Sequence, residues 1–130
     1  MASIFSRIVN KEIPAHVVAE TDDYLAFLDV RPQAKGHTLV IPKKEVDYIF
    51  DMEDEHLAGM MIFAKQVAKA VKKTVSCSRI GIAVVGLEVP HAHVHLMPIN
   101  TVSDLGFGKN LGISNEELKE LAGKIAANMD

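Results

Sequence analysis

This 130-residue sequence has a single cysteine and no large excess of charge of either sign, and each of these features excludes a class of protein. The only cysteine, Cys77, cannot form a disulfide within the chain, which argues against a disulfide-stapled secreted domain. The formal net charge of -3 provides no basic surface to hold a phosphodiester backbone. Nucleic acid is therefore not an expected partner, and any anionic ligand must be bound by local groups.

Long apolar runs are also missing. The longest largely apolar stretch, residues 80–89, is well short of the roughly 18 residues that a membrane-spanning helix needs. The first seven residues lack the apolar core of a signal peptide. With 48% hydrophobic and 24% charged residues, the chain can bury a core of its own. We expect one soluble domain over residues 1–130, in the reducing cytoplasm and without a membrane partner.

The order of the predicted elements indicates an α+β fold built on a mostly antiparallel sheet. Apolar residues at helical spacing predict a short helix over residues 3–9, and Pro14 prevents its continuation. Two stretches rich in β-forming residues flank a three-residue turn, as in a hairpin. The predicted strands, about five in number, are residues 17–20, 24–28, 38–41, 78–85 and 92–99.

Two further helices are predicted. Residues 53–73 carry apolar side chains at the i, i+3, i+4, i+7 spacing of a long amphipathic helix, with Asp51 as its N-cap. Phe63 and Ala70 lie beside the main apolar stripe, which fits either contact with a partner subunit or a wider core face. A capping box opens a C-terminal helix over residues 114–128.

The most informative segment is a run of three alternating histidines, His91, His93 and His95. Alternate residues of a strand point to one face, so these imidazoles line one side while the apolar residues between them pack on the other. Three imidazoles in a row are not a core pattern. The run therefore marks a candidate site.

From the residues alone, a metal site and a metal-free histidine nucleophile are equally good interpretations. Same-face neighbours on a strand lie about 6.5 Å apart, whereas zinc holds its nitrogen ligands at about 2.0–2.1 Å, so all three histidines cannot easily share one ion. Two of them could, with further ligands from elsewhere, and the other histidines are His16, His37 and His56. A neutral imidazole can equally act as a nucleophile whose phosphorus adduct passes its group onward.

The segment His91-Ala92-His93-Val94-His95-Leu96-Met97 resembles the signature of the histidine triad (HIT) family, His-x-His-x-His followed by apolar residues. The branch most similar is the Hint-like nucleoside phosphoramidate hydrolases. Other stretches look like the family in the family's own order, over about residues 3–98. They are Ile4-Phe5 with Ile8, Lys11-Glu12-Ile13-Pro14-Ala15, Leu25-Ala26-Phe27 with Asp29, and Pro32-Gln33-Ala34 with His37 and Leu39-Val40-Ile41-Pro42-Lys43-Lys44.

The resemblance implies a HIT-like fold and an enzyme that needs no metal or other cofactor. Such an enzyme cleaves a nucleoside monophosphate derivative, a phosphoramidate or a dinucleotide-type compound, at the α-phosphorus. His93 is the implied nucleophile and forms a nucleotidyl-imidazole, while His91 and His95 orient the substrate and donate to phosphate oxygens. His37 matches a family position behind the triad and would act as an orienting residue.

The resemblance also implies how a nucleotide is bound. Asp29 would accept hydrogen bonds from both ribose hydroxyls, and Glu88 occupies a position that holds a hydroxyl residue or glutamate in relatives. A purine base is implied, without a choice between adenine and guanine, and so is a homodimer in which the long helix and a strand continue the sheet. The residues that match the base pocket, each equally suited to an ordinary core, are Phe5, Ile8, Phe27 and Val30.

The sequence departs from the family at two places. Many bacterial relatives hold a structural zinc with two cysteines, a histidine and the first triad histidine, but this chain has Ser3, Ser6 and Glu45 instead. Serine is a poor zinc ligand, so we predict that this site is absent. Leu87 stands where the family usually has glutamine. The second departure motivates an alternative hypothesis, a nucleotide-binding regulatory module with little turnover.

Overall fold

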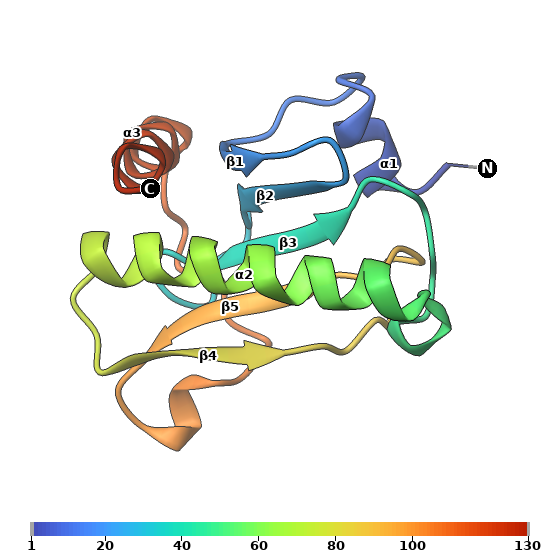
Figure 1. The fold of residues 1–130 in the computed structure, drawn as a ribbon. Coiled ribbons are helices and arrows are strands. Elements are labelled where there is room, and N and C mark those ends of the chain that lie inside the picture. Colours follow the sequence, from blue (N-terminus) through green and yellow to red (C-terminus); the bar gives the residue numbers. More distant parts are fainter. Residues whose placement is uncertain (1, 130) are drawn as a thin grey trace.

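The structure, a computed structural model, describes residues 2–129 and has the predicted α+β architecture (Figure 1). One sheet has the strand order β1-β2-β3-β5-β4, and every neighbouring pair is antiparallel. Helix α2 lies across one face of this sheet. The elements are α1 (Ile4–Val9), β1 (Val17–Glu20), β2 (Tyr24–Leu28), β3 (Thr38–Pro42), η1 (Ile49–Asp51), α2 (Asp54–Thr74), β4 (Arg79–Ala83), β5 (Val94–Ile99), η2 (Val102–Asp104) and α3 (Asn115–Ala127).

The alternation of side chains along the strands separates two apolar clusters, one on each face of the sheet. In β2, Ala26 and Leu28 join the main core with α2 and α3, whereas Leu25 and Phe27 pack on the other face against α1. In β5, Val94 and Leu96 enter the main core and the histidine between them faces the α1 side. The α1 face of the sheet is therefore the face of the candidate site.

The two strands nearest the histidine run are shorter than predicted. The sequence predicted strands over residues 78–85 and 92–99, but β4 ends at Ala83 and β5 begins only at Val94. The backbone N–H of Ala92 donates to the carbonyl of Val46, 2.6 Å away, instead of pairing with β3. His91 and His93 therefore precede the regular strand.

Helix α2 begins later than its predicted N-cap. Asp51 belongs to the preceding turn η1, so the assignment of Asp51 as N-cap is wrong, and the N-cap position is held by Glu53 without a side-chain hydrogen bond. Met52 explains the difference, because its backbone is extended and its side chain is buried. The chain is thus pinned to the core just before the helix starts.

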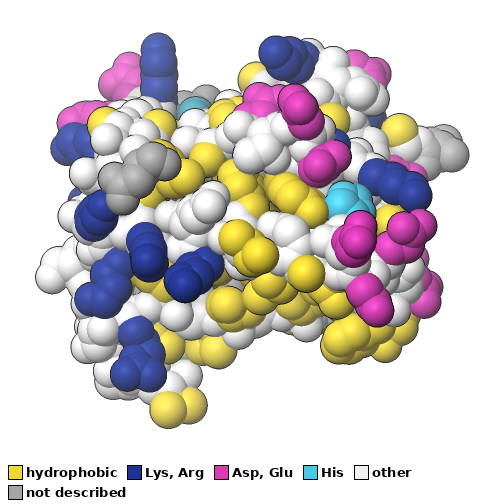
Figure 2. Space-filling view, in the orientation of Figure 1, with side chains coloured by type: hydrophobic (Ala, Val, Ile, Leu, Met, Phe, Trp, Pro, Cys, Tyr) yellow, Lys and Arg dark blue, Asp and Glu magenta, His cyan; other side chains and the backbone are white. Residues whose placement is uncertain are grey.

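The faces of α2 resolve an alternative that the sequence left open. Phe63 and Ala70 are both buried in this chain's own core, so they widen the core face of the helix. Ile62, by contrast, is 61% exposed. Figure 2 shows hydrophobic side chains gathered along the middle of this side of the molecule, with acidic residues near the start of α2 and basic residues near its end. That charge order suits the helix dipole.

Helix α3 forms as the sequence predicted and closes the main core. The hydroxyl of Ser114 accepts a hydrogen bond from the N–H of Glu117 at 3.2 Å and so caps its first turn. One face packs against β1 and α2 through the buried residues Leu118, Leu121, Ala122 and Ile125. None of the helices within residues 2–129 combines the length and the apolar character needed to cross a membrane.

The burial of Ile125 predicts that α3 contributes to stability. This side chain is fully buried, so Ile125→Ala should leave a cavity and lower the free energy of unfolding by about 2–5 kcal/mol. Urea unfolding followed by circular dichroism measures the change. The exposed residue Lys119 of the same helix supplies the control, since Lys119→Ala removes no core contact. Equal stability of the two variants would mean that α3 is not docked as described.

Candidate active site

His91 is wholly buried, and both of its ring nitrogens are engaged within the protein. Nε2 lies 2.7 Å from the carbonyl oxygen of Pro42, and Nδ1 lies 2.8 Å from the hydroxyl of Ser3. A carbonyl can only accept, so Nε2 carries a hydrogen. Burial lowers the pKa of His91, which favours the neutral ring, and Nδ1 then accepts from Ser3. His91 therefore has no ring nitrogen to offer a phosphate, unlike the expected role, and its backbone carbonyl is what reaches the site.

His93 is fixed in the tautomer that a nucleophile needs. Its Nδ1 lies 2.7 Å from the carbonyl oxygen of His91, so Nδ1 carries the hydrogen and, in the neutral ring, Nε2 carries the lone pair. Within the described residues, Nε2 has no hydrogen-bond partner, and no side-chain nitrogen or oxygen is both buried and unpartnered. The basic nitrogen of His93 is thus accessible. The ring of Phe5 packs edge-on against this imidazole at 5.0 Å.

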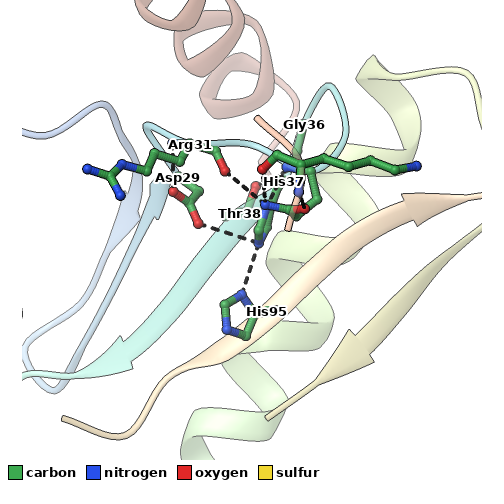
Figure 3. A network of polar contacts seen from close by, with 8 residues as sticks. Asp29, Arg31, Gly36, His37, Thr38 and His95 are labelled. Atoms are coloured by element: carbon green, nitrogen blue, oxygen red, sulfur yellow. Dashed lines mark hydrogen bonds and ion pairs between the residues drawn. The ribbon is translucent and has the colours of Figure 1, made fainter. Parts of the chain in front are cut away.

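His95 is oriented by His37, as Figure 3 shows. The N–H of Gln33 donates to Nδ1 of His37 at 3.1 Å, so the hydrogen of a neutral His37 sits on Nε2. That Nε2 donates to Nδ1 of His95 at 2.9 Å, which leaves His95 with a hydrogen on its own Nε2. Burial, with a further contribution from nearby His93, lowers the pKa of each ring to about 4. The pair therefore presents a neutral N–H donor to the site.

Asp29 follows β2 and reaches the same pair of rings (Figure 3). One of its oxygens accepts from the N–H of Arg31 at 2.8 Å, and the other lies 3.7 Å from Nε2 of His37. The side chain is 22% exposed. Burial raises the pKa of this carboxyl, against the lowering effect of the Arg31 hydrogen bond. One carboxylate oxygen thus remains open to a ligand.

Asp29, His37 and His95 are also the described residues that could bring three metal-ligating atoms together, all within 4.8 Å of one another. Two nitrogens on one tetrahedral zinc ion would lie about 3.4 Å apart, given zinc–nitrogen bonds of about 2.0–2.1 Å. Here Nε2 of His37 and Nδ1 of His95 are 2.9 Å apart and already share a hydrogen bond. A metal at this place would have to break that bond.

Three of the four expected base-pocket residues lie together and one does not. Phe5 and Phe27 are buried, with ring centroids 5.6 Å apart, and Ile8 packs against the same cluster. Val30 is 61% exposed and lies outside the cluster. Glu88 is exposed on the loop before the histidine run. The apolar wall beside His93 is therefore built mainly from α1 and β2.

A cavity of about 560 Å³ borders His93, and the sequence analysis did not identify it. Its lining is largely apolar and includes Tyr48, Phe50, Met61, Val84 and Val85. The only signal in the sequence is the pair of aromatic residues, in a chain where aromatic residues are 5% of the total. Leu87, on the same loop as the two valines, is 88% exposed and lies apart from the lining.

Phe107 is a second residue that the sequence analysis did not place at the site. Its ring packs edge-on against His95, with centroids 4.8 Å apart. Gln33 holds this loop in place, because its side-chain amide accepts from the N–H of Lys109 at 2.8 Å and donates to the Lys109 carbonyl at 2.7 Å. Glycines on both sides of Phe107 were the available signal.

The fold and the tautomers of the triad define a small α+β protein in which one imidazole nitrogen, Nε2 of His93, is accessible. Residues 10–102 match the HIT domain family model. The chain belongs to the histidine triad (HIT) family.

Relatives and solved structures agree with this assignment over nearly the whole chain. An uncharacterized HIT-like protein from Borreliella burgdorferi is 36% identical, and the match covers 97% of each chain. An adenosine 5'-monophosphoramidase from Schizosaccharomyces pombe is also 36% identical, with 98% of each chain covered. The crystal structure of a Hit-like protein from Bartonella henselae superposes with a TM-score of 0.86 at 36% identity, covering 98% of this chain and 96% of the other.

The buried histidine pair predicts a pH dependence of stability. Because burial lowers the pKa of His37 and of His95 from 6.5 to about 4, the unfolded chain binds more protons than the folded chain between these values. Stability is therefore full above pH 6.5 and falls as the pH is lowered towards 4, each group contributing at most about 1.4 kcal/mol per pH unit. Urea unfolding at a series of pH values should show a shallower decline for His37→Asn than for the wild type. An unchanged slope would argue against a neutral buried His37.

Proposed function

We propose that this HIT-family hydrolase cleaves nucleoside monophosphate derivatives at the α-phosphorus through a covalent nucleotidyl-His93 intermediate. The supporting observation is the hydrogen bond from Nδ1 of His93 to the His91 carbonyl, which leaves the Nε2 lone pair accessible. Nε2 bonds to phosphorus while the bond to the leaving group breaks, and the leaving group keeps that electron pair and takes up a proton from solvent. Water then attacks phosphorus and releases a proton to solvent, the N–P bond returns its pair to Nε2, and the nucleoside monophosphate leaves.

The neighbouring histidines have different parts in this proposal. His95 donates from Nε2 to a phosphate oxygen, where negative charge grows during attack, and His37 keeps it in that tautomer. His91 acts through its backbone carbonyl, which orients His93. Because His37 and His95 are neutral at neutral pH, Nδ1 of His95 can accept from His37 while Nε2 of His95 donates to the phosphate.

The nucleotide would lie along the α1 face of the sheet. The open oxygen of Asp29 accepts from the ribose hydroxyls, and Phe5, Ile8 and Phe27 contact the base, with Val30 at the exposed edge. Glu88 stands on the loop that leads into the histidine run and would face the phosphate side. A flat purine suits this apolar wall, and none of these residues selects adenine over guanine.

A phosphorus–nitrogen bond is the preferred target, with phosphorus–oxygen bonds of dinucleotide-type compounds as the second class. The S. pombe relative, named as an adenosine 5'-monophosphoramidase, supports this order.

One observation favours a second candidate, a nucleotide-binding regulatory module with little turnover. Leu87 is 88% exposed and carries no group that could assist a leaving group. Such a module would bind nucleotides at the same wall without forming an adduct. Turnover separates the two candidates.

The covalent mechanism predicts an adduct on His93. Intact mass spectrometry after brief mixing with an adenosine phosphoramidate should show a transient adenylyl adduct on the wild type and none on His93→Ala. Turnover by the variant should be abolished while adenosine monophosphate binding persists, because the base and ribose contacts remain. His16→Ala, which removes a histidine outside the triad, is the matched control and should keep both adduct and turnover.

Two other outcomes would reassign the function. Binding without adduct or turnover in the wild type would establish the regulatory module. Activity that disappears with a chelator and returns with a divalent metal would establish a metal-dependent hydrolase with Asp29, His37 and His95 as the candidate ligands. Adduct formation unaffected by a chelator contradicts both.

We also propose a homodimer joined through β4 and the neighbouring part of α2. Within the described residues β4 pairs only with β5, so its outer edge is free to pair across a two-fold axis. Exposed apolar side chains flank that edge, among them Ile62 at 61%, Ile82 at 48% and Val85 at 50%. This arrangement matches the family expectation of a sheet that continues into a second subunit.

The dimer surface predicts that a charge on β4 weakens association. Ile82→Lys should shift the molar mass measured by sedimentation or light scattering from dimer towards monomer, since the ammonium group would be buried at the interface. Val17 supplies the control, because it is similarly exposed, at 43%, but lies on β1 at the opposite edge of the sheet. A dimer that survives Ile82→Lys and is lost with Val17→Lys would contradict the proposal, because the interface would then lie at the β1 edge.

A further inference from the structure

A cluster of polar groups joins the start of α1 to the loop after β3 and to the first histidine of the run. One oxygen of Glu45, Oε1, accepts from the N–H of Ser3 at 2.6 Å and from the hydroxyl of Ser6 at 2.7 Å. Both serine hydroxyls also approach Nδ1 of His91, at 2.8 Å for Ser3 and 3.3 Å for Ser6. The hydrogen bonds from the Ser3 N–H and the Ser6 hydroxyl hold the pKa of Glu45 at about 2, so the carboxylate is charged at any working pH.

The shortest contacts in this cluster favour one assignment of its donors and acceptors. The single hydroxyl hydrogen of Ser6 goes to the carboxylate of Glu45, so Ser6 has none left for His91. The N–H of Ser6 donates to the hydroxyl oxygen of Ser3 at 3.0 Å. The Ser3 hydroxyl therefore donates its hydrogen to Nδ1 of His91. Glu45 thus determines that Ser3, and not Ser6, donates the hydrogen bond to His91.

The fixed orientation of His91 also fixes that of His93. With Nδ1 accepting from Ser3 and Nε2 donating to Pro42, the His91 ring is held at both ends. Its carbonyl is then fixed where it accepts from Nδ1 of His93. The same helix turn carries Phe5, whose ring contacts His91 at 5.8 Å and His93 at 5.0 Å.

Helix α1 depends on such an anchor. It has six residues, and a helix of this length is not stable alone in water. Glu45 holds it at Ser3, its N-cap, and at Ser6 in its first turn. Loss of the Glu45 carboxylate would therefore free both the Ser3 hydroxyl, which donates to His91, and the Phe5 ring, which contacts His93.

We infer that Glu45 is a positioning residue, which acts through Ser3 and Ser6 to hold His91 and thereby keeps His93 in the tautomer with an accessible Nε2. Glu45 does not touch the reacting atoms in this arrangement. The predicted loss of turnover rests on the proposed function, whereas the predicted change of tautomer does not. The two can therefore fail separately.

The test compares Glu45→Ala, Glu45→Gln and Ser3→Ala with the wild type. Nitrogen-15 NMR of the imidazoles should show hydrogen on Nε2 of His91 and on Nδ1 of His93 in the wild type. In Glu45→Ala and Ser3→Ala the His93 signals should move towards a mixture of tautomers. With an adenosine phosphoramidate, kcat should fall roughly ten- to hundredfold with KM changed less than about twofold, because misalignment of a nucleophile acts on the chemical step.

The conservative variant and a surface control sharpen the test. An amide oxygen can still accept both hydrogen bonds that Oε1 of Glu45 accepts, so Glu45→Gln should keep the wild-type tautomers and most of kcat. Glu20→Ala removes another exposed carboxylate that is hydrogen-bonded, to Lys43 at 2.6 Å, and should change neither readout. Thermal unfolding verifies that each variant is folded at the assay temperature.

Several outcomes would overturn the inference. These are unchanged His91 and His93 tautomers in folded Glu45→Ala or Ser3→Ala, or a loss of kcat in Glu45→Gln as large as in Glu45→Ala. If Glu45→Ala does not fold, Ser3→Ala decides alone, because it removes the donor to His91 and keeps the carboxylate. If the wild type shows no turnover, the proposed function fails, while the NMR comparison still decides the inference.

Discussion

Hydrogen-bond satisfaction of buried imidazoles is the constraint on which the rest of the site depends. Four histidine rings crowd one face of the sheet, and within residues 2–129 every buried side-chain nitrogen and oxygen has a partner. Each partner removes one of the two tautomers open to a neutral ring. What remains is an accessible lone pair on Nε2 of His93 and an N–H donor at Nε2 of His95. The groups that can meet a ligand are therefore those that the buried hydrogen bonds leave unpaired.

The periodicity of the sequence was enough to predict the architecture. Alternation placed the three histidines on one face and Ala92, Val94 and Leu96 in the core, and the apolar stripe of α2 and the face of α3 were predicted from spacing alone. The HIT resemblance then supplied the expected roles of His91, His93 and His95. These features are local or repeated along the chain, so a sequence displays them directly.

The remaining features depend on contacts between distant segments. Asp51 resembles a helix cap, but burial of Met52 delays the helix. Ser3 and His91 are 88 positions apart, and Gln33 and Lys109 are 76 apart, so no short pattern reveals either contact. Ser3, Ser6 and Glu45 lack the zinc-binding groups of relatives, and nothing in the sequence indicates that they still surround His91. The part that could not be predicted is therefore the orientation of side chains by tertiary partners.

The shortness of α1 has a consequence for how this protein can change over evolutionary time. The six residues of α1 include Phe5, which contacts His93, and Ser6, whose hydroxyl donates to Glu45. A mutation that reshapes the wall at Phe5 also disturbs the ring of His93, so selectivity and reactivity are not independent traits here. Exposed loop positions without a contact to the triad, such as Leu87, meet no such penalty. Diversification should therefore accumulate on the loops, while α1 changes slowly.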